Sequence, residues 1–148
     1  MKRKIAGNLL SWKNNPKRKP LLLQGARQVG KSYTLFSFGK EQYKNVAYFS
    51  MENSTGISDV FERDMNPERI IGELSAISGV SILPDDTLVI FDEVQASERA
   101  LLSLKYFAER APRYHIAAAG SLLGVAMKRE RYSFPAGKVD MLRLHPKR

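Results

Sequence analysis

The fold of this chain is decided by the stretch Leu22-Leu-Gln-Gly25-Ala-Arg-Gln-Val-Gly30-Lys31-Ser32. From Gly25 onward it matches the pattern Gly-x-x-x-x-Gly-Lys-Ser/Thr of phosphate-binding (Walker A) loops, with an apolar run before it and an amphipathic stretch after it. The glycines let the backbone curl so that successive N–H groups face a phosphate chain, and the following helix adds its positive dipole end. The pattern therefore predicts a nucleotide-binding loop between a buried strand and a helix.

Two side chains at the end of the loop have the chemistry that a bound nucleotide requires. The ammonium group of Lys31 is expected to reach the β- and γ-phosphates, and the hydroxyl of Ser32 is expected to ligate Mg²⁺. The chain has no Asn-Lys-x-Asp stretch for guanine recognition, so ATP is the expected nucleotide. Candidates for the adenine contact are Tyr33 and the connector 14–19. The predicted nucleotide-binding residues are Gly25, Ala26, Arg27, Gln28, Val29, Gly30, Lys31, Ser32 and Tyr33.

A second informative stretch, Leu88-Val-Ile-Phe91-Asp92-Glu93, has the Walker B form of an apolar strand that ends in two acids. In a strand next to the loop, Asp92 lies within reach of the Mg²⁺ shell as a metal ligand, and Glu93 can orient or deprotonate the attacking water. Adjacent carboxylates at a strand end can also be solvated loop residues. Their position in the same predicted sheet as Lys31 favours the site, and Glu93 favours hydrolysis over transfer to a small molecule.

A third polar point, Ser121, follows the apolar run 116–120. Ligands of parallel sheets lie beyond the carboxyl ends of the strands, so this hydroxyl is a catalytic candidate that can contact the γ-phosphate or the lytic water. An equally good interpretation is that Ser121 caps a helix beginning at Leu122. Gln95 is a further candidate to face the nucleotide. No arginine can be assigned to the transition state, so a neighbouring subunit or a further domain is a candidate source.

Short apolar runs alternate with longer amphipathic stretches along the chain, which is typical of βα units around a parallel sheet. Before them, Ile5, Leu9 and Trp12 lie on one face of a predicted helix that packs on the main body. The expected strands are 21–23, 46–50, 87–91, 114–119 and 139–144, and the expected helical stretches are 31–38, 58–78 with a new helix at Asn66-Pro67, and 96–110. The predicted division is a basic helix and connector over 1–19 and a nucleotide-binding core over 20–148.

The composition excludes several classes of function. With 148 residues, 43% hydrophobic and 26% charged, the chain is expected to form one globular domain. It has no cysteine and two histidines, which excludes disulfides, thiolate chemistry and His clusters. The uncharged stretch 116–127 is too short for a spanning helix, which needs roughly 20 apolar residues, and the basic start lacks the apolar run of a signal peptide. A cytoplasmic protein without membrane contact is expected.

The charge is distributed unevenly. The formal net charge is +9, but residues 1–19 carry seven Lys/Arg without an acid and residues 128–148 carry seven with two acids. The body, 20–127, holds ten basic and thirteen acidic residues. Basic flanks can bind nucleic acid or anionic lipid through phosphate contacts, but they lack interleaved aromatic residues, and a solvated surface is the simpler interpretation.

Several segments together resemble the AAA_14 group of prokaryotic P-loop ATPases. They are Leu22–Ser32, Ile90–Gln95, Leu104–Ala108, Ala118–Gly124, Phe134–Val139 and the first helix with Trp12. The resemblance implies an α/β three-layer P-loop fold of the AAA-like, additional-strand type, with a parallel five-stranded sheet in the order 51432. It implies ATP and Mg²⁺ as ligands and the roles given above to Lys31, Ser32, Asp92, Glu93 and Ser121.

The resemblance also implies further structure. Members usually run on from a segment like Leu142–Pro146 into more helices and a C-terminal domain, so the chain resembles an ATPase core that stops after its fifth strand. A core without that region is expected to hydrolyse ATP poorly by itself, since a helical lid and a trans arginine would be missing.

The main hypothesis is a Mg²⁺-dependent ATPase domain that hydrolyses ATP to ADP and phosphate. One alternative is a nucleic-acid-binding module whose affinity ATP switches, which rests on the basic flanks. A second is a regulatory module that binds ATP without turnover. A homo-oligomer is an expected partner arrangement for the first hypothesis, and a small-molecule kinase has the weakest support.

Overall fold

The computed structural model describes residues 2–25, 30–52, 56–121 and 137–144. Its elements in chain order are α1 (Lys2–Asn14), β1 (Leu21–Gly25), α2 (Lys31–Gln42), β2 (Asn45–Ser50), α3 (Ile57–Glu62), α4 (Pro67–Ser78), β3 (Thr87–Asp92), the 3₁₀ turn η1 (Val94–Ala96), α5 (Glu98–Arg110), β4 (His115–Ser121) and β5 (Asp140–Arg143).

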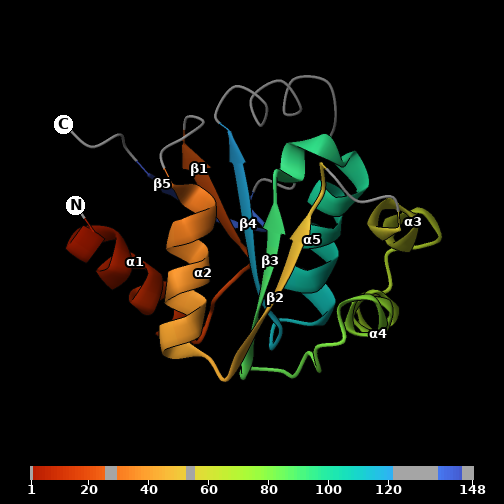
Figure 1. The fold of residues 1–148 in the computed structure, drawn as a ribbon, viewed down its shortest axis with the longest axis horizontal. Coiled ribbons are helices and arrows are strands. Elements are labelled where there is room, and N and C mark those ends of the chain that lie inside the picture. Colours follow the sequence, from red (N-terminus) through yellow and green to blue (C-terminus); the bar gives the residue numbers. More distant parts are fainter. Residues whose placement is uncertain (1, 26–29, 53–55, 122–136, 145–148) are drawn as a thin grey trace.

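The described strands form a five-stranded sheet in the order β2-β3-β4-β1-β5, and every neighbouring pair is parallel. Numbered from the β5 edge, this is the order 51432 that the family resemblance implies, so that prediction is confirmed. The arrowheads of β2, β3 and β4 in Figure 1 point to one edge of the sheet. The segments that follow β1, β3 and β4 therefore leave from the same edge, where the two sequence motifs meet.

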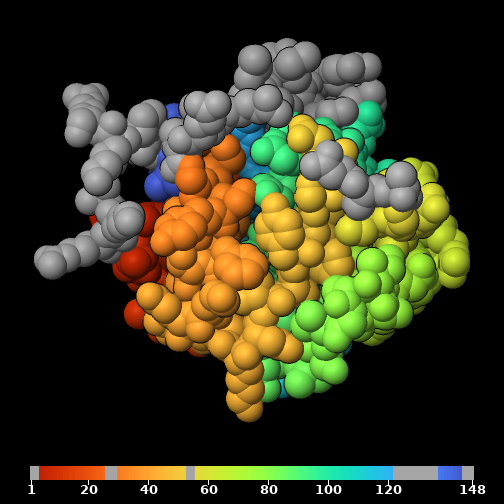
Figure 2. Space-filling model, viewed as in Figure 1, coloured from red at the N-terminus to blue at the C-terminus, as the bar shows by residue number. Residues whose placement is uncertain are grey.

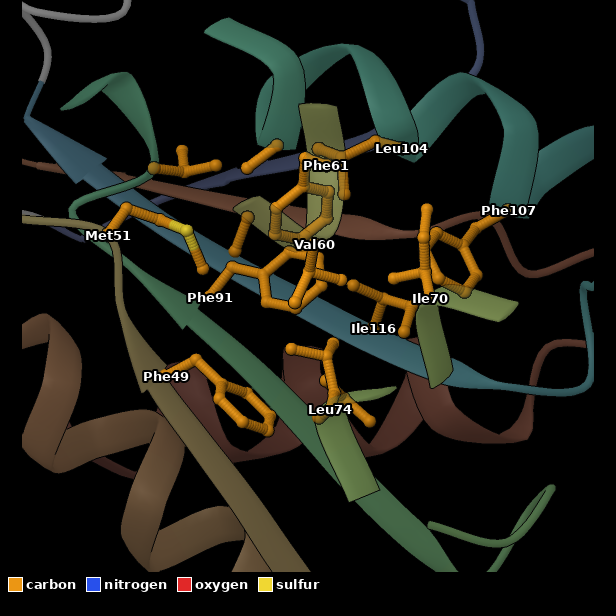
Figure 3. Close-up of a cluster of buried hydrophobic side chains, with 14 of the residues drawn as sticks. Phe49, Met51, Val60, Phe61, Ile70, Leu74, Phe91, Leu104, Phe107 and Ile116 are labelled. Atoms are coloured by element: carbon orange, nitrogen blue, oxygen red, sulfur yellow. The ribbon is translucent and has the colours of Figure 1, made fainter. Parts of the chain in front are cut away.

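Successive residues of each strand point to opposite faces of the sheet, and helices cover both faces, so the fold has three layers. In β3, Leu88 and Ile90 pack with residues of α1 and α2, whereas Val89 and Phe91 pack with residues of α3, α4 and α5. On the second face, Phe61 of α3 meets Phe91 edge to face with 5.5 Å between ring centroids (Figure 3). The even-numbered residues of β3, among them Asp92, therefore point to the face that α1 and α2 cover.

Helix α1 packs on the main body, as its apolar spacing predicts. Ile5, Leu9 and Trp12 are buried in the cluster beneath α2, and the indole Nε1 of Trp12 donates a hydrogen bond of 2.7 Å to the carbonyl of Lys19. No helix in the described part of the chain combines the length and apolar character that crossing a bilayer requires.

The helical stretch 58–78 divides where the sequence predicts. Asn66 caps α4, since its side-chain oxygen accepts from the N–H groups of Glu68 at 3.0 Å and Arg69 at 3.4 Å, and Pro67 occupies the first turn. The prediction of one helix over 96–110 is wrong at its start. Ser97 is extended and caps α5 through the N–H of Ala100, so the helix begins at Glu98 after a separate 3₁₀ turn.

Candidate nucleotide-binding site

The loop after β1 returns to a helix whose first residue is the predicted phosphate lysine. Gly30 has φ +81°, a left-handed conformation that glycine adopts without strain, and α2 begins at the next residue. The side chain of Lys31 is buried, and its Nζ donates a hydrogen bond of 3.2 Å to the carbonyl of Gly25 at the end of β1. The ammonium group thus lies across the base of the loop. The predicted contacts Ala26, Arg27, Gln28 and Val29 lie outside the described residues.

The structure brings the two predicted metal ligands together. The hydroxyl of Ser32, in the first turn of α2, donates a hydrogen bond of 2.6 Å to Oδ2 of Asp92 at the carboxyl end of β3. Asp92 is only 5% exposed. A hydroxyl bonded to a buried carboxylate is a charge-assisted contact, which is stronger than a bond between neutral groups.

The Asp92 carboxylate has two further donors. Its Oδ1 accepts from the backbone N–H of Glu93 at 2.9 Å, and its Oδ2 accepts from the hydroxyl of Tyr48 in β2. Burial, and then the hydrogen bond to Asp92, raise the pKa of Tyr48 to about 12, so the phenol stays protonated and donates. Sequence reasoning missed Tyr48. Tyr48 can be found from the alternation of side chains along β2, but only once the pairing of β2 with β3 is known.

Glu93 follows Asp92 in a left-handed conformation with φ 50°, which is uncommon for a residue with a side chain. Its Oε1 accepts a hydrogen bond of 2.7 Å from Nε2 of Gln95, the middle residue of η1. The Oε1 of Gln95 is buried and has no hydrogen-bond partner among the described residues. The side chains of Glu93 and Gln95 therefore form a polar pair next in sequence to Asp92. The Oε1 of Gln95 can still accept a hydrogen bond.

Ser121 is the last residue of β4, and its backbone lies in register with Gly25 of the neighbouring β1. The residue is thus located at the carboxyl edge of the sheet beside the start of the loop. Leu122, where a helix is predicted to begin, lies outside the described residues, so the phosphate contact and the helix cap both remain predictions for Ser121.

The oxygen ligands present suit Mg²⁺. Ser32 offers a hydroxyl and Asp92 a carboxylate, and Mg²⁺ is commonly held by one or two such ligands together with water and substrate phosphates. Within the described ranges, no group of three or more His, Cys, Asp or Glu side chains could hold a metal ion. The donor set therefore fits a cation that enters with a nucleotide.

The two adenine candidates are located at different places. Tyr33 is 68% exposed and lines a cavity of about 290 Å³ between α1 and α2, together with Ile5 and Leu9. The connector 14–19 lies at the amino edge of the sheet, where the N–H of Lys19 donates to the side chain of Asp140 at the start of β5. The adenine contact stays a prediction for both candidates.

Comparisons with known proteins place these residues in context. A family model for an AAA domain, AAA_14, matches residues 17–148. The structure is similar to the RuvB Holliday junction branch migration motor of Thermotoga maritima, with a TM-score of 0.58, 13% sequence identity, and coverage of 97% of this chain and 43% of that one. It is also similar to closed-state Hsp104 solved with ATPγS and FITC casein, with a TM-score of 0.65, 14% identity, and coverage of 99% and 27%.

At these identities the solved structures show a shared fold. The chain spans less than half the length of these two solved chains. No curated protein matches the sequence.

Proposed function

The chain belongs to the AAA_14 family of AAA ATPase domains, and we propose that its site binds ATP with Mg²⁺ and hydrolyses it to ADP and phosphate. The hydrogen bond of 2.6 Å between Ser32 and Asp92 carries the proposal. It joins the start of the loop helix to the end of an acidic strand, which are the two parts that a P-loop ATPase uses to hold a metal-bound triphosphate. That Hsp104 was solved with ATPγS supports the choice of ATP.

Phosphate binding is assigned to the loop and to Lys31. The loop follows β1, and α2 begins directly after Gly30. The first N–H groups of this helix of 12 residues therefore point toward the loop. The Lys31 ammonium group, bonded to the Gly25 carbonyl, is close enough to the loop to move onto a phosphate oxygen. In this proposal Tyr33 lies beside the base.

The cation would be held by Ser32 and Asp92. When bound, Mg²⁺ supplies positive charge that stabilises the negative charge on the β- and γ-phosphates. The residues themselves contribute orientation, since the Asp92 carboxylate is buried and hydrogen-bonded on both oxygens.

Hydrolysis is assigned to Glu93. The oxygen of a water molecule bonds to the γ-phosphorus, the bond from that phosphorus to the bridging oxygen of ADP breaks, and Glu93 takes a proton from the attacking water. Gln95 holds the Glu93 carboxylate, and Ser121 contacts the γ-phosphate or the water from the neighbouring strand end. An arginine for the transition state is proposed to come from a second copy of the chain or from a further domain.

Binding and turnover are tested with separate variants. Lys31→Ala is expected to weaken binding of a fluorescent, slowly hydrolysed ATP analogue by at least about 100-fold, since the side-chain cation assigned to the β- and γ-phosphates is lost. The exposed Lys44, which pairs with Asp86 at 3.6 Å, provides a control: Lys44→Ala should bind like the unmodified chain. Unchanged binding by Lys31→Ala would contradict the proposal.

Glu93→Gln separates an ATPase from a module without turnover. The variant keeps a polar side chain of the same size but cannot take a proton, so binding should persist while phosphate release falls by about 100-fold or more. An unchanged rate would show that hydrolysis does not depend on this site.

Two of the described flank cations, Arg18 and Lys138, contact other parts of the molecule. The side chain of Arg18 is only 13% exposed, and it donates hydrogen bonds to the carbonyls of Lys13 and Pro112. Lys138 pairs with Glu109 at 3.3 Å. These two cations have partners within the molecule, and the nucleic-acid alternative rests on the charge of the basic flanks.

A further inference from the structure

Tyr48 contacts the candidate metal ligand Asp92 although neither sequence motif includes it. Its hydroxyl donates to Oδ2, the same carboxylate oxygen that accepts from Ser32. The three groups come from three separate elements, β2, β3 and α2. The contact is therefore a tertiary one that depends on the fold.

The register of the sheet places the phenol there. Ser50 of β2 pairs directly with Asp92, and Tyr48, two residues earlier, points to the same face of the sheet. A side chain as long as tyrosine can span the diagonal between neighbouring strands. The residue reaches the carboxylate from the side of β2, which is an edge strand of the described sheet.

The ring of Tyr48 is held in place by α2. It packs edge to face against Phe36, with ring centroids 6.3 Å apart and an interplanar angle of 64°. This arrangement is one of the preferred geometries of aromatic pairs. In Figure 2, α2 in orange lies beside β2 in yellow on the visible face of the molecule. The helix that carries Ser32 thus also fixes the position of the phenol.

A carboxylate needs such contacts in order to present one orientation. The terminal torsion of aspartate has a broad distribution, so packing alone does not define where its oxygens point. In Asp92, the N–H of Glu93 holds Oδ1 at 2.9 Å, and Ser32 and Tyr48 hold Oδ2. If Ser32 turns toward a cation, Tyr48 remains as the side-chain donor that defines the carboxylate plane.

We propose that Tyr48 is a positioning residue, which orients the Asp92 carboxylate and so sets the affinity of the Ser32–Asp92 pair for a divalent cation. The inference rests on the proposed function, because it concerns the cation that accompanies the nucleotide. Groups that orient a metal ligand through hydrogen bonds typically change metal affinity by about 10- to 100-fold when they are removed.

The test is a Mg²⁺ titration of nucleotide binding by the full chain and its Tyr48→Phe variant. Tyr48→Phe keeps the ring against Phe36 and removes only the hydroxyl. The Mg²⁺ concentration that gives half of the maximal binding of a fluorescent, slowly hydrolysed ATP analogue should rise by at least about 10-fold. Affinity for the same analogue in EDTA should not change. Tyr106→Phe removes a phenol hydroxyl from α5, on the other face of the sheet, and should titrate like the unmodified chain.

The outcomes separate the two proposals. If the unmodified chain binds the analogue neither with nor without Mg²⁺, the proposed function fails. If the unmodified chain binds the analogue in a Mg²⁺-dependent way, the proposed function stands. The role of Tyr48 is overturned if the half-maximal Mg²⁺ concentration of Tyr48→Phe lies within about twofold of that of the unmodified chain, or below it. An equal loss of affinity in EDTA and in Mg²⁺ would also overturn it, since Tyr48 would then have a general structural role. Urea unfolding of both chains checks that the variant is folded.

Discussion

Ser32 and Asp92 lie 60 positions apart in the sequence, and a hydrogen bond of 2.6 Å joins the hydroxyl of one to the carboxylate of the other. The contact exists because β1 and β3 both run toward one edge of the sheet, on either side of β4, and α2 crosses over that sheet. The first turn of α2 and the end of β3 thus meet at that edge.

The strength of this contact can be measured in the ligand-free protein. In a double-mutant cycle with Ser32→Ala and Asp92→Asn, the coupling free energy of unfolding should be about 1–3 kcal/mol, because the bond involves a charged and buried acceptor. Urea unfolding of the four proteins gives the value. The cycle is needed because Asp92→Asn alone also removes a buried charge. Additive effects, within about 0.5 kcal/mol, would show that the two side chains do not interact.

Gln95 is predicted to affect turnover more than binding. Its Nε2 holds Oε1 of Glu93 at 2.7 Å, so Gln95→Ala frees the proposed base to adopt other rotamers. The expected result is a kcat lower by roughly 10- to 100-fold with an unchanged affinity for ATP, since misplacement of a reacting group by even about 1 Å has effects of this size. Phosphate release and analogue binding measure the two quantities.

A matched control for Gln95 is Gln42→Ala, at the exposed end of α2. It removes the same amide from a position outside the site and should leave both quantities unchanged. A Gln95→Ala variant that loses affinity and keeps its kcat would assign the side chain to nucleotide binding.

The sequence predicts most of the fold because its signals are local. The loop pattern, the apolar runs and the spacing of Ile5, Leu9 and Trp12 each depend on neighbouring residues, and the structure confirms the strands and helices that they predict. The strand order is not a local property, and it was available only through the family resemblance. The start of α5 is misplaced because Ser97 takes the N-cap position and accepts from the N–H of Ala100, which the apolar periodicity does not register.

The candidate site was predictable where it follows a motif. Lys31, Ser32, Asp92 and Glu93 occupy motif positions, and the structure brings the first three to one edge of the sheet through the contacts of Lys31 with Gly25 and of Ser32 with Asp92. Tyr48 could not be found in this way, because its contact depends on the β2–β3 register rather than on spacing along the chain. Long-range pairing is therefore the information that the motifs lack.

Gly39 is predicted to be required for the packing of α2 on the sheet. A Cβ at this position would lie 2.6 Å from Cγ2 of Val46 and 3.0 Å from Cδ2 of Leu88. Overpacking typically costs about 1–3 kcal/mol, whereas alanine gains at most about 1 kcal/mol of helix propensity over glycine. Gly39→Ala should therefore lower the free energy of unfolding, as measured with urea.

Gly72 in α4 serves as the control for Gly39, because alanine at position 72 is expected to raise the free energy of unfolding rather than lower it. A Cβ there meets no atom within 4 Å, so Gly72→Ala should stabilise the protein by up to about 1 kcal/mol. If both variants gain stability, the close approach at Gly39 is not a constraint.

At the opposite edge of the sheet from the candidate site, a buried histidine at the start of β4 contacts residues of two connecting segments. The hydroxyl of Tyr43 lies 2.6 Å from Nδ1 of His115, and Nε2 of His115 lies 3.0 Å from Oδ1 of Asp85. The Asp85 carboxylate only accepts, so Nε2 carries the proton, and a neutral ring then leaves Nδ1 free to accept from Tyr43. In the neutral ring both nitrogens are thus hydrogen-bonded.

This network predicts a loss of stability in mild acid. Burial lowers the pKa of His115 to about 4, and the charge of Arg18 acts in the same direction, against the raising effect of Asp85. The unfolded chain takes up the proton near pH 6.5, so between about pH 6.5 and pH 4 it binds more protons than the folded protein, and the free energy of unfolding falls as the pH falls. Urea unfolding at pH 7 and pH 5 should show a smaller fall for His115→Gln than for the unmodified chain, because the variant cannot take up this proton. Equal falls in the two proteins would mean that His115 titrates normally in the folded state, and an NMR titration of its ring would then show a pKa near 6.5 instead of about 4.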